Sequence, residues 1–263
     1  MSTHNTDTHN EESKGSAEAE RLTEIVTGAQ SVVFFGGAGI STESGIPDFR
    51  SDTGLYTTES GGKYPPEYML SHSCFVEHPL DFYSFYRNKM LYPDAKPNAA
   101  HRALAALERR GTVRAVVTQN IDGLHQAAGS HTVYELHGSV HRNFCVDCGA
   151  AYTMEFIRTS SGIPRCTQCG GIIKPDVVLY EEPLDENIID SAVAAISAAD
   201  VLIVGGTSLN VYPAAGLIHY FNGSHLILIN KSVTPADAAA ELAIHDSLGT
   251  VLSSLVDPAD LAS

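Results

Sequence analysis

Two pairs of cysteines have the spacing of metal ligands. Cys145 and Cys148 form one Cys-x-x-Cys pair, and Cys166 and Cys169 form a second pair after a 17-residue spacer. Each pair can bring two thiolates to one ion from a tight turn, and the glycines that follow each pair help such turns to close. Four thiolates leave no open coordination position, so we expect one structural zinc ion per chain. The spacing alone leaves an iron–sulfur cluster open.

A second group of residues combines glycines, amides, carboxylates and one imidazole. Gly36-Gly37-Ala38-Gly39 follows an apolar run and could bring backbone amides close to a pyrophosphate, although Thr42 stands where the usual dinucleotide fingerprint has its third glycine. His137 could shuttle a proton near neutral pH. The other polar clusters lie at residues 45–51, 118–125, 205–208 and 230–231.

Most of these clusters begin where an apolar run of strand length ends. The runs are residues 31–35, 113–117, 132–136, 201–204 and 226–229. Helical patterns lie between them, at residues 99–110, with Asn98 as N-cap and Gly111 as the stop, and at residues 186–198. This alternation predicts a Rossmann-like parallel α/β sheet with helices on both faces. Ligands bind beyond the carboxyl ends of such strands, so we expect one shared cleft.

Two segments interrupt the alternation and predict a small second domain. Residues 57–94 are rich in aromatic side chains and predict a helical insertion, whereas residues 144–171 contain both cysteine pairs and predict a zinc ribbon. The Rossmann-like domain would then consist of residues 17–56, 95–143 and 172–263. Residues 1–16 are polar, and we expect them to form a disordered tail.

The charge balance argues against one class of partner. The chain has 16 basic and 31 acidic residues and a formal charge of −15, whereas nonspecific nucleic-acid binding needs a basic surface. The acidity suits cationic ligands such as lysine-rich peptides, but solubility alone can also explain it. No apolar run approaches membrane-spanning length, and the first residues do not form a secretory signal. Paired cysteines suit a reducing compartment, and we expect the cytoplasm.

In their order along the chain, these motifs resemble those of the sirtuin family. The matching segments are residues 37–41, 45–51, 118–125, 137–139, both cysteine pairs and residues 206–209. The resemblance covers roughly residues 20–256, and the chain looks most like the bacterial, single-domain members. It implies an NAD-dependent protein-lysine deacetylase, which transfers the acetyl group to ADP-ribose and releases nicotinamide and O-acetyl-ADP-ribose.

The resemblance also implies roles for individual residues. His137 would be the general base, and Asn120 and Asp122, together with Gln119, would orient the nicotinamide ribose and carboxamide. Asp48, Phe49 and Arg50 would line the nicotinamide pocket, where Phe49 would shield the reactive carbon. The further contacts that it implies for NAD are Ala38, Gly39, Thr42, Ile121, Gly206, Thr207, Ser208, Asn230, Lys231 and Leu248.

The substrate peptide would lie as an extended strand between two segments of the chain. The residues implied to flank it are Val177, Val178, Leu179 and Tyr180 on one side and Leu209, Asn210 and Val211 on the other. Tyr180-Glu181 stands where many family members have phenylalanine-glycine, a difference that bears on the peptide preference.

The acyl preference can be inferred from one helical stretch. Family members that prefer succinyl or malonyl groups carry a tyrosine and, three residues later, an arginine. Here Tyr83 is followed by Tyr86 at that position, and Arg87 comes one residue later. On a helix this shift turns the side chain by about 100°. Deacetylation is therefore favoured, with longer apolar acyl groups as an alternative.

Three other functions remain as alternatives. A nicotinamide oxidoreductase would bind NAD but should have a fuller dinucleotide fingerprint and needs no zinc ribbon. A non-enzymatic NAD-sensing protein would not need His137. A mono-ADP-ribosyltransferase would share all of these motifs. For the favoured function we expect acetyl-lysine proteins or peptides as partners, no direct nucleic-acid binding, no membrane association and a monomer.

Overall fold

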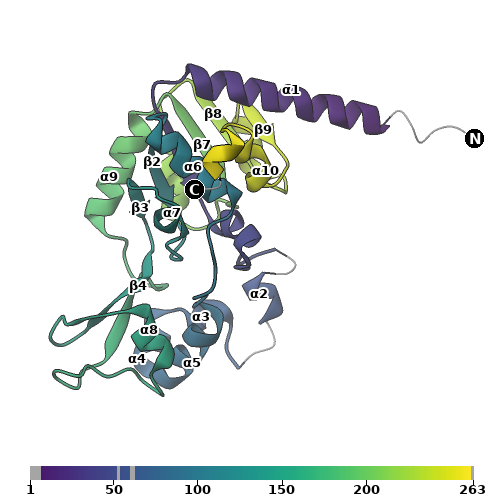
Figure 1. Cartoon of the computed structure of the whole chain (residues 1–263). Coiled ribbons are helices and arrows are strands. Elements are labelled where there is room, and N and C mark those ends of the chain that lie inside the picture. The colour runs from purple at the N-terminus through teal and green to yellow at the C-terminus, as the bar shows by residue number, and fades with distance from the viewer. Residues whose placement is uncertain (1–6, 52–53, 60–62, 262–263) are drawn as a thin grey trace, which may run out of the picture.

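The structure is a computed structural model that describes residues 7–51, 54–59 and 63–261. Figure 1 shows a larger sheet domain above a smaller domain, with one long helix projecting sideways from the larger domain at the N-terminus. Within these residues, no helix has both the length and the apolar character needed to cross a membrane.

The larger sheet is parallel throughout and has six strands in the order β3-β2-β1-β7-β8-β9. The strands are β1 (Val32–Gly36), β2 (Val113–Thr118), β3 (Val133–Glu135), β7 (Val201–Gly205), β8 (His225–Ile229) and β9 (Leu242–Ile244). Five of them lie within a residue or two of the predicted runs, and β9 was not predicted. The prediction of a Rossmann-like parallel sheet is confirmed.

Both faces of this sheet are buried, which explains why its central strands β1 and β7 are apolar along their whole length rather than at every second position. Val32 and Phe34 of β1 belong to one hydrophobic cluster, and Val33 and Phe35 belong to another on the opposite face. The first cluster includes residues of α1 (Asp7–Gly28), α6 (Ala99–Arg109) and α10 (Leu248–Ser253). The second includes residues of α9 (Glu186–Ser197) and η2 (Ala214–Tyr220).

Local signals in the sequence explain where α6 begins and ends. The Asn98 side chain accepts hydrogen bonds from the backbone amides of Ala100 and His101, as an N-cap should. Gly111 has a φ of 80°, the left-handed conformation that terminates many helices. Both predictions for this helix are therefore confirmed.

The smaller domain joins a three-stranded antiparallel sheet to short helices. The sheet has the order β5-β4-β6 and consists of β4 (Gly138–Cys145), β5 (Ala151–Tyr152) and β6 (Ile173–Val177). The helices are α2 (Leu55–Thr58), α3 (Pro66–Met69), α4 (His72–Glu77), α5 (Pro79–Lys89) and α8 (Met154–Thr159). Phe82 and Tyr83 of α5 share one core with Ile157 and Ile173, so the insertion and the cysteine-bearing segment form one unit.

The structure corrects two predictions about the limits of the domains. The helix α1 begins at Asp7, so most of the tail expected to be disordered is helical. Its residues 11–16 are Glu-Glu-Ser-Lys-Gly-Ser, and the polar composition of the segment concealed the helix. Residues 1–6 of the predicted tail lie outside the described residues. Residues 173–177 were assigned to the large domain, but they form β6 and pair with β4 of the small sheet. The chain therefore leaves and re-enters the large domain along two adjacent antiparallel strands.

Four short elements remain: three of them follow strands of the large sheet, and one lies near the C-terminus. They are η1 (Ala38–Ser44), α7 (Leu124–Ala127), η3 (Pro235–Ala239) and η4 (Pro258–Leu261).

Candidate active site and metal centre

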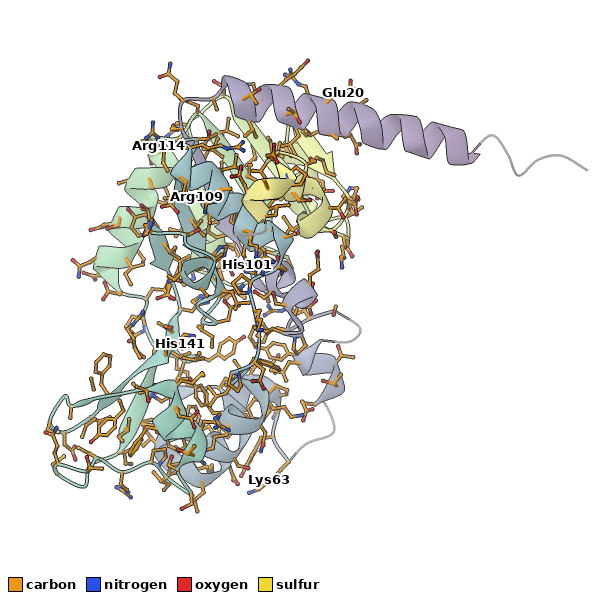
Figure 2. The ribbon with its side chains drawn as sticks, in the orientation of Figure 1. Glu20, Lys63, His101, Arg109, Arg114 and His141 are labelled. Atoms are coloured by element: carbon orange, nitrogen blue, oxygen red, sulfur yellow. The ribbon has the colours of Figure 1, made fainter. Side chains whose placement is uncertain are left out.

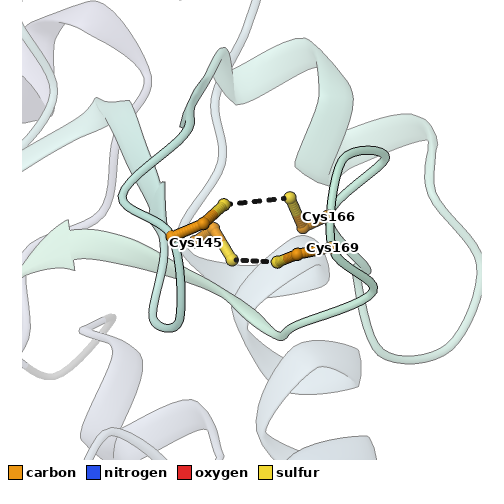
Figure 3. Close-up of side chains that lie close together, drawn as sticks. Cys145, Cys166 and Cys169 are labelled. Atoms are coloured by element: carbon orange, nitrogen blue, oxygen red, sulfur yellow. Dashed lines mark hydrogen bonds between the residues drawn. The ribbon is translucent and has the colours of Figure 1, made fainter.

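The four paired cysteines converge in the small domain as predicted. Their sulfur atoms all lie within 4.8 Å of one another, and none of the four forms a disulfide. The Sγ atoms of Cys145 and Cys169 are 3.4 Å apart and those of Cys148 and Cys166 are 3.6 Å apart. Figure 3 marks the sulfur–sulfur contacts with dashed lines. A tetrahedral zinc ion with bonds of about 2.3 Å places its sulfur ligands about 3.8 Å apart, so the cluster fits a structural zinc ion.

The glycines beside the cysteines are needed for this geometry. Gly149 and Gly170 have φ values of 71° and 80°, which other residues rarely adopt. A Cβ atom on Gly171 would lie 2.9 Å from the sulfur of Cys145. Outside the four ligands, the hydroxyl of Tyr152 donates a hydrogen bond of 3.1 Å to the sulfur of Cys166. Such a donor stabilises a thiolate and orients it toward a metal.

At the carboxyl edge of the large sheet, two glycine-rich turns cross at very short range. The amide of Gly39 donates a hydrogen bond of 2.8 Å to the carbonyl of Gly206. A Cβ atom on Gly39 would lie only 2.6 Å from the Cα atom of Gly206, and one on Gly37 only 2.8 Å from the Cβ atom of Thr207. These glycines therefore allow the turn after β1 to pack on the turn after β7.

A buried hydroxyl joins the turn after β1 to the loop after β2. Ser41 is 1 % exposed, and its Oγ atom donates a hydrogen bond of 2.7 Å to the Asp122 carboxylate. The same oxygen accepts a hydrogen bond of 3.1 Å from the Asn120 side chain. Burial raises the pKa of Asp122, whereas the hydrogen bonds from Leu124 and Ser41 oppose that shift. Ser41 belongs to the motif of residues 37–41, but its contacts with Asn120 and Asp122 were not predicted.

A second set of contacts connects the ends of β2, β7 and β8. The side-chain amide of Gln119 donates a hydrogen bond of 3.1 Å to the hydroxyl of Thr207. The backbone amide of Thr207 in turn donates one of 3.0 Å to the side-chain oxygen of Asn230. Leu248, which is 4 % exposed, packs directly against Gly205 at the end of β7. A Cβ atom on Gly205 would lie only 2.7 Å from the Leu248 side chain. The structure thus brings together residues that the sequence analysis assigned to one cleft.

His137 lies between β3 and β4 and is held in one tautomer. Its Nδ1 atom is 2.8 Å from the backbone carbonyl of Gln119. A carbonyl oxygen can only accept, so Nδ1 carries the proton and Nε2 of the neutral ring keeps its lone pair. Burial lowers the pKa of His137, and the hydrogen bond to Gln119 opposes this shift. The ring is therefore neutral at pH 7 and able to act as a base.

The loop that follows η1 is organised by Asp48. One oxygen of its carboxylate accepts hydrogen bonds from the backbone amides of Arg50, at 3.0 Å, and Ser51, at 2.8 Å. Phe49 is half-buried, and its ring packs edge-on against Tyr56 with centroids 5.5 Å apart. Arg50 is exposed, and its guanidinium carbon lies 5.4 Å from the centre of the same tyrosine ring.

The other residues assigned to NAD are more dispersed. Ala38 and Thr42 lie in η1 and are half-buried, whereas Ser208 and Lys231 are exposed at the ends of β7 and β8. Ile121 accepts a hydrogen bond of 3.0 Å from the amide of Val140 in β4. Asn98, which was predicted only as a helix cap, also donates a hydrogen bond of 2.7 Å to the carbonyl of Ile40 in η1.

The two segments assigned to the peptide are connected to this site through backbone groups. The amide of Val178 donates a hydrogen bond of 3.0 Å to the carbonyl of His137. The amide of Leu209 donates one of 3.2 Å to the hydroxyl of Thr207, which Gln119 also contacts. Val177 and Leu179 are buried, Val178 and Val211 are half-buried, and Tyr180 and Asn210 are exposed.

The basic side chains of α5 are engaged by neighbouring groups: Lys89 forms an ion pair of 2.7 Å with Glu59, and Arg87 contacts the cysteine-bearing segment. The side chain of Arg87 donates hydrogen bonds to the carbonyls of Ile157, at 2.8 Å, and Gly162, at 2.7 Å, in the cysteine-bearing segment. Tyr83 is buried, and its hydroxyl donates a hydrogen bond to the carbonyl of Ile173. Tyr86 is also fully buried.

Figure 2 shows His141 at the junction of the two domains and His101 inside the larger one. His141 donates a hydrogen bond of 3.0 Å from Nε2 to the carbonyl of Asp122, so β4 of the small domain touches the loop that carries Asn120 and Asp122.

The fold and the site together define a class of α/β nucleotide-binding proteins in which a metal-bearing module adjoins the carboxyl edge of the sheet.

Comparisons with known proteins identify the family within that class. The model of the Sir2 family matches residues 37–213, and the chain belongs to this family. The resemblance to sirtuins is therefore confirmed.

Two relatives named NAD-dependent protein deacetylase illustrate the similarity. The one from Clostridium acetobutylicum is 62 % identical over 89 % of this chain and 96 % of its own length. The one from Staphylococcus aureus is 45 % identical over 90 % of this chain and 97 % of its own length.

Two solved structures show the same similarity in three dimensions. One is described as a Sir2 protein with a p53 peptide and NAD+, with a TM-score of 0.78 and 39 % identity over 89 % of this chain and 95 % of that one. Another, from work on the mechanism and regulation of Sir2 enzymes, has a TM-score of 0.82 and 40 % identity over 94 % of this chain and 98 % of that one.

Proposed function

We propose that the chain is an NAD-dependent protein-lysine deacetylase with His137 as its general base. The observation that carries the proposal is the hydrogen bond between His137 Nδ1 and the Gln119 carbonyl, which leaves Nε2 as a base in the neutral ring. Relatives that carry this enzyme name match the chain over nearly its whole length.

The reaction needs an acid–base group beside a ribose. NAD supplies a ribose carbon from which nicotinamide departs as the acetyl oxygen attacks. In our proposal, Asn120 and Asp122 orient the ribose, and His137 accepts a proton from one of its hydroxyls. Water then completes acetyl transfer to the sugar, so that lysine, nicotinamide and O-acetyl-ADP-ribose leave. Burial keeps His137 unprotonated before this step.

The crossing glycine turns and their neighbours fit the diphosphate and riboses of NAD. We assign Ala38, Gly39, Thr42, Gly206, Thr207 and Ser208 to the diphosphate side and Asn230, Lys231 and Leu248 to the adenosine side. Asp48, Phe49, Arg50, Gln119 and Ile121 would surround the nicotinamide. Residues 177–180 and 209–211 would pair with the substrate backbone on either side. The four cysteines would hold zinc, which stabilises the small domain rather than taking part in the reaction.

Acetyl is the acyl group that the structure favours. A succinyl or malonyl group brings a carboxylate that needs a cation, and Arg87 is engaged by two backbone carbonyls of the cysteine-bearing segment. The substrates would be acetylated proteins or peptides. We further propose that the protein works as a monomer in the cytoplasm, where thiols stay reduced, and that its acidic surface does not bind nucleic acid directly.

The proposal is tested by incubating the zinc-loaded protein with NAD and an acetyl-lysine peptide and following both products by mass spectrometry. We expect nicotinamide and deacetylated peptide in equal amounts, and a loss of at least about 100-fold in His137→Ala, as removal of a general base predicts. The exposed His131 provides a matched control, because His131→Ala should retain the wild-type rate.

Other outcomes would select another function. NAD binding without nicotinamide release would favour an NAD-sensing protein. Nicotinamide release without deacetylated peptide would favour ADP-ribosyl transfer, and formation of NADH would favour an oxidoreductase.

A further inference from the structure

Residues 177–180, one of the two segments assigned to peptide binding, continue into Glu181 and Glu182. Hydrogen bonds connect residues 180–182 to the helical insertion. The amide of Tyr180 donates a hydrogen bond of 3.0 Å to the carbonyl of Leu70, and its carbonyl accepts one of 3.0 Å from the amide of His72. Glu181 adopts a φ of 77°, and its carboxylate accepts hydrogen bonds from the amide and hydroxyl of Ser73. These contacts fix the position of Tyr180 against the start of α4.

Glu182 adds a second attachment to the same segment. Its carboxylate accepts a hydrogen bond of 2.9 Å from the amide of Leu179 and forms an ion pair of 2.9 Å with Lys174. The segment therefore has little freedom at its C-terminal end, and a side chain placed there can act as a fixed point.

On the other side, Tyr56 contacts the loop of residues 48–50 in three ways. Its amide donates a hydrogen bond of 2.9 Å to the carbonyl of Phe49, and the two rings pack edge-on. The guanidinium of Arg50 lies over the face of the same ring, at a distance typical of a cation–π contact. The preceding residue, Leu55, also donates to the carbonyl of Asp48, at 2.8 Å. Tyr56 is thus the direct support of the loop assigned to nicotinamide.

The hydroxyls of Tyr56 and Tyr180 are 2.5 Å apart, so one donates a hydrogen bond to the other. Burial raises the pKa of Tyr56 well above its usual range, and the bond to Tyr180 adds to that shift, so the Tyr56 hydroxyl keeps its proton. This bond connects the segment that follows Val177–Leu179 with the loop of Asp48, Phe49 and Arg50, two parts of the chain with different assigned ligands.

We propose that the Tyr56–Tyr180 hydroxyl pair is a positioning contact that couples peptide binding to NAD binding. A peptide that pairs with residues 177–180 adds to the contacts that already hold Tyr180, Tyr180 holds Tyr56, and Tyr56 holds the loop that receives nicotinamide. The coupling is reciprocal, because two ligands that stabilise one arrangement raise each other's affinity by the same factor. The inference rests on the proposed deacetylase function.

The test compares Tyr56→Phe, Tyr180→Phe and the double variant with the wild-type enzyme in steady-state deacetylation. Each variant keeps the aromatic ring and removes one hydroxyl. We expect the KM for NAD at saturating peptide to rise about three- to tenfold, the range that one hydrogen bond supports, while kcat stays within about twofold. The double variant should match the single ones, because either change alone breaks the same bond.

A matched control is Tyr68→Phe, which removes from α3 a hydroxyl that bonds to Glu77 within the insertion. It should leave the KM for NAD unchanged. Equal KM values in all the proteins, or additive effects in the double variant, would overturn the coupling. If the wild-type chain itself releases no nicotinamide, the proposed function fails instead, and binding of NAD with and without peptide, measured by calorimetry, still tests the coupling.

Discussion

Ser41 and Asp122, which are 81 positions apart in the sequence, share a hydrogen bond of 2.7 Å between the turn after β1 and the loop after β2. The serine hydroxyl also accepts a hydrogen bond from the Asn120 side chain, so one oxygen orders the side chains of Asn120 and Asp122. The contact matters because a buried carboxylate that loses a donor is costly to keep ionised.

Ser41→Ala should therefore lower the free energy of unfolding by about 1–3 kcal/mol and raise the KM for NAD about tenfold or more. Chemical denaturation and steady-state kinetics measure the two effects. Ser191→Ala, on the surface of α9, removes a serine hydroxyl that bonds only within its own helix, and it should change neither quantity. A fully active Ser41→Ala enzyme would show that Asp122 does not depend on this donor.

The state of His137 predicts how activity varies with pH. Only the neutral ring can act as a base, and burial lowers its pKa below the ordinary value of 6.5. Activity should therefore be complete at pH 7 and fall as the pH decreases through this lowered pKa. Nicotinamide release measured between pH 5 and 9 checks this, with circular dichroism confirming that the protein remains folded. A half-maximal rate above pH 7 would contradict the assignment.

The close crossing of the two glycine turns makes Gly39 intolerant of any side chain. In Gly39→Ala the new Cβ would lie 2.6 Å from the Cα atom of Gly206, so the turns must separate. We expect a loss of roughly 1–3 kcal/mol in stability, typical of overpacking, and NAD affinity at least tenfold weaker by calorimetry. Gly28→Ala, with no atom within 4 Å of its new Cβ, is the control and should bind NAD normally.

The cysteine cluster predicts one zinc ion per chain. Elemental analysis should find zinc and not iron, and a strong chelator should remove it together with deacetylase activity, because binding energy and folding of the small domain are linked. Cys166→Ser should behave like the chelated protein. Cys74→Ala should retain its zinc, because Cys74 lies in α4 outside the cluster. Full activity after complete metal removal would show that the small domain folds without zinc.

Two buried imidazoles predict a loss of stability in acid. His101 and His125 pack edge-on with centroids 4.8 Å apart, and both are at most 1 % exposed. Burial lowers the pKa of His101 to about 4 and that of His125 well below 6.5. Both are neutral in the folded chain but protonate near pH 6.5 when unfolded, so stability present above that pH is lost as the pH falls.

Each imidazole should lower the free energy of unfolding by about 1.4 kcal/mol for each pH unit that the pH falls between 6.5 and the pKa of that imidazole in the folded chain. Unfolding by urea at pH 7 and pH 5 measures the change. His101→Gln should make the stability less dependent on pH, whereas His131→Gln, at an exposed position, should not. An unchanged pH dependence in His101→Gln would rule out this source of acid sensitivity.

The features that the sequence predicted are those encoded by short-range patterns. The predicted ends of the first, second and fourth strands lie one residue before Gly36, Thr118 and Gly205, and they were visible because strands buried on both faces are nearly continuous apolar runs. The cysteine pairs were visible because their ligand spacing is local. The gathering of Gln119, Thr207 and Asn230 followed from a single topological rule about parallel sheets.

The contacts that were missed join distant segments through ordinary residue types. The local sequence around Ser41 or Tyr56 does not name the residue that its hydroxyl contacts, because the partners become neighbours only in the folded chain. The edge strand β9 is only 3 residues long, too short to give a clear apolar run, and the strand β6 contains Pro175, which is unusual in a strand. The pairing of β6 with β4 places β6 in the small domain, and the position of these residues in the sequence does not reveal that pairing.

The sheet order places β1 between β2 and β7, although β7 begins only at Val201. A ribosome therefore delivers the whole small domain, with all four cysteines, before it delivers the strand that covers one side of β1. Until then the apolar edge Val-Val-Phe-Phe has no partner there, and such an edge is a template for pairing between nascent chains. We expect newly made chains to be most prone to aggregation at this stage of synthesis, with zinc already bound and the central strand still half paired.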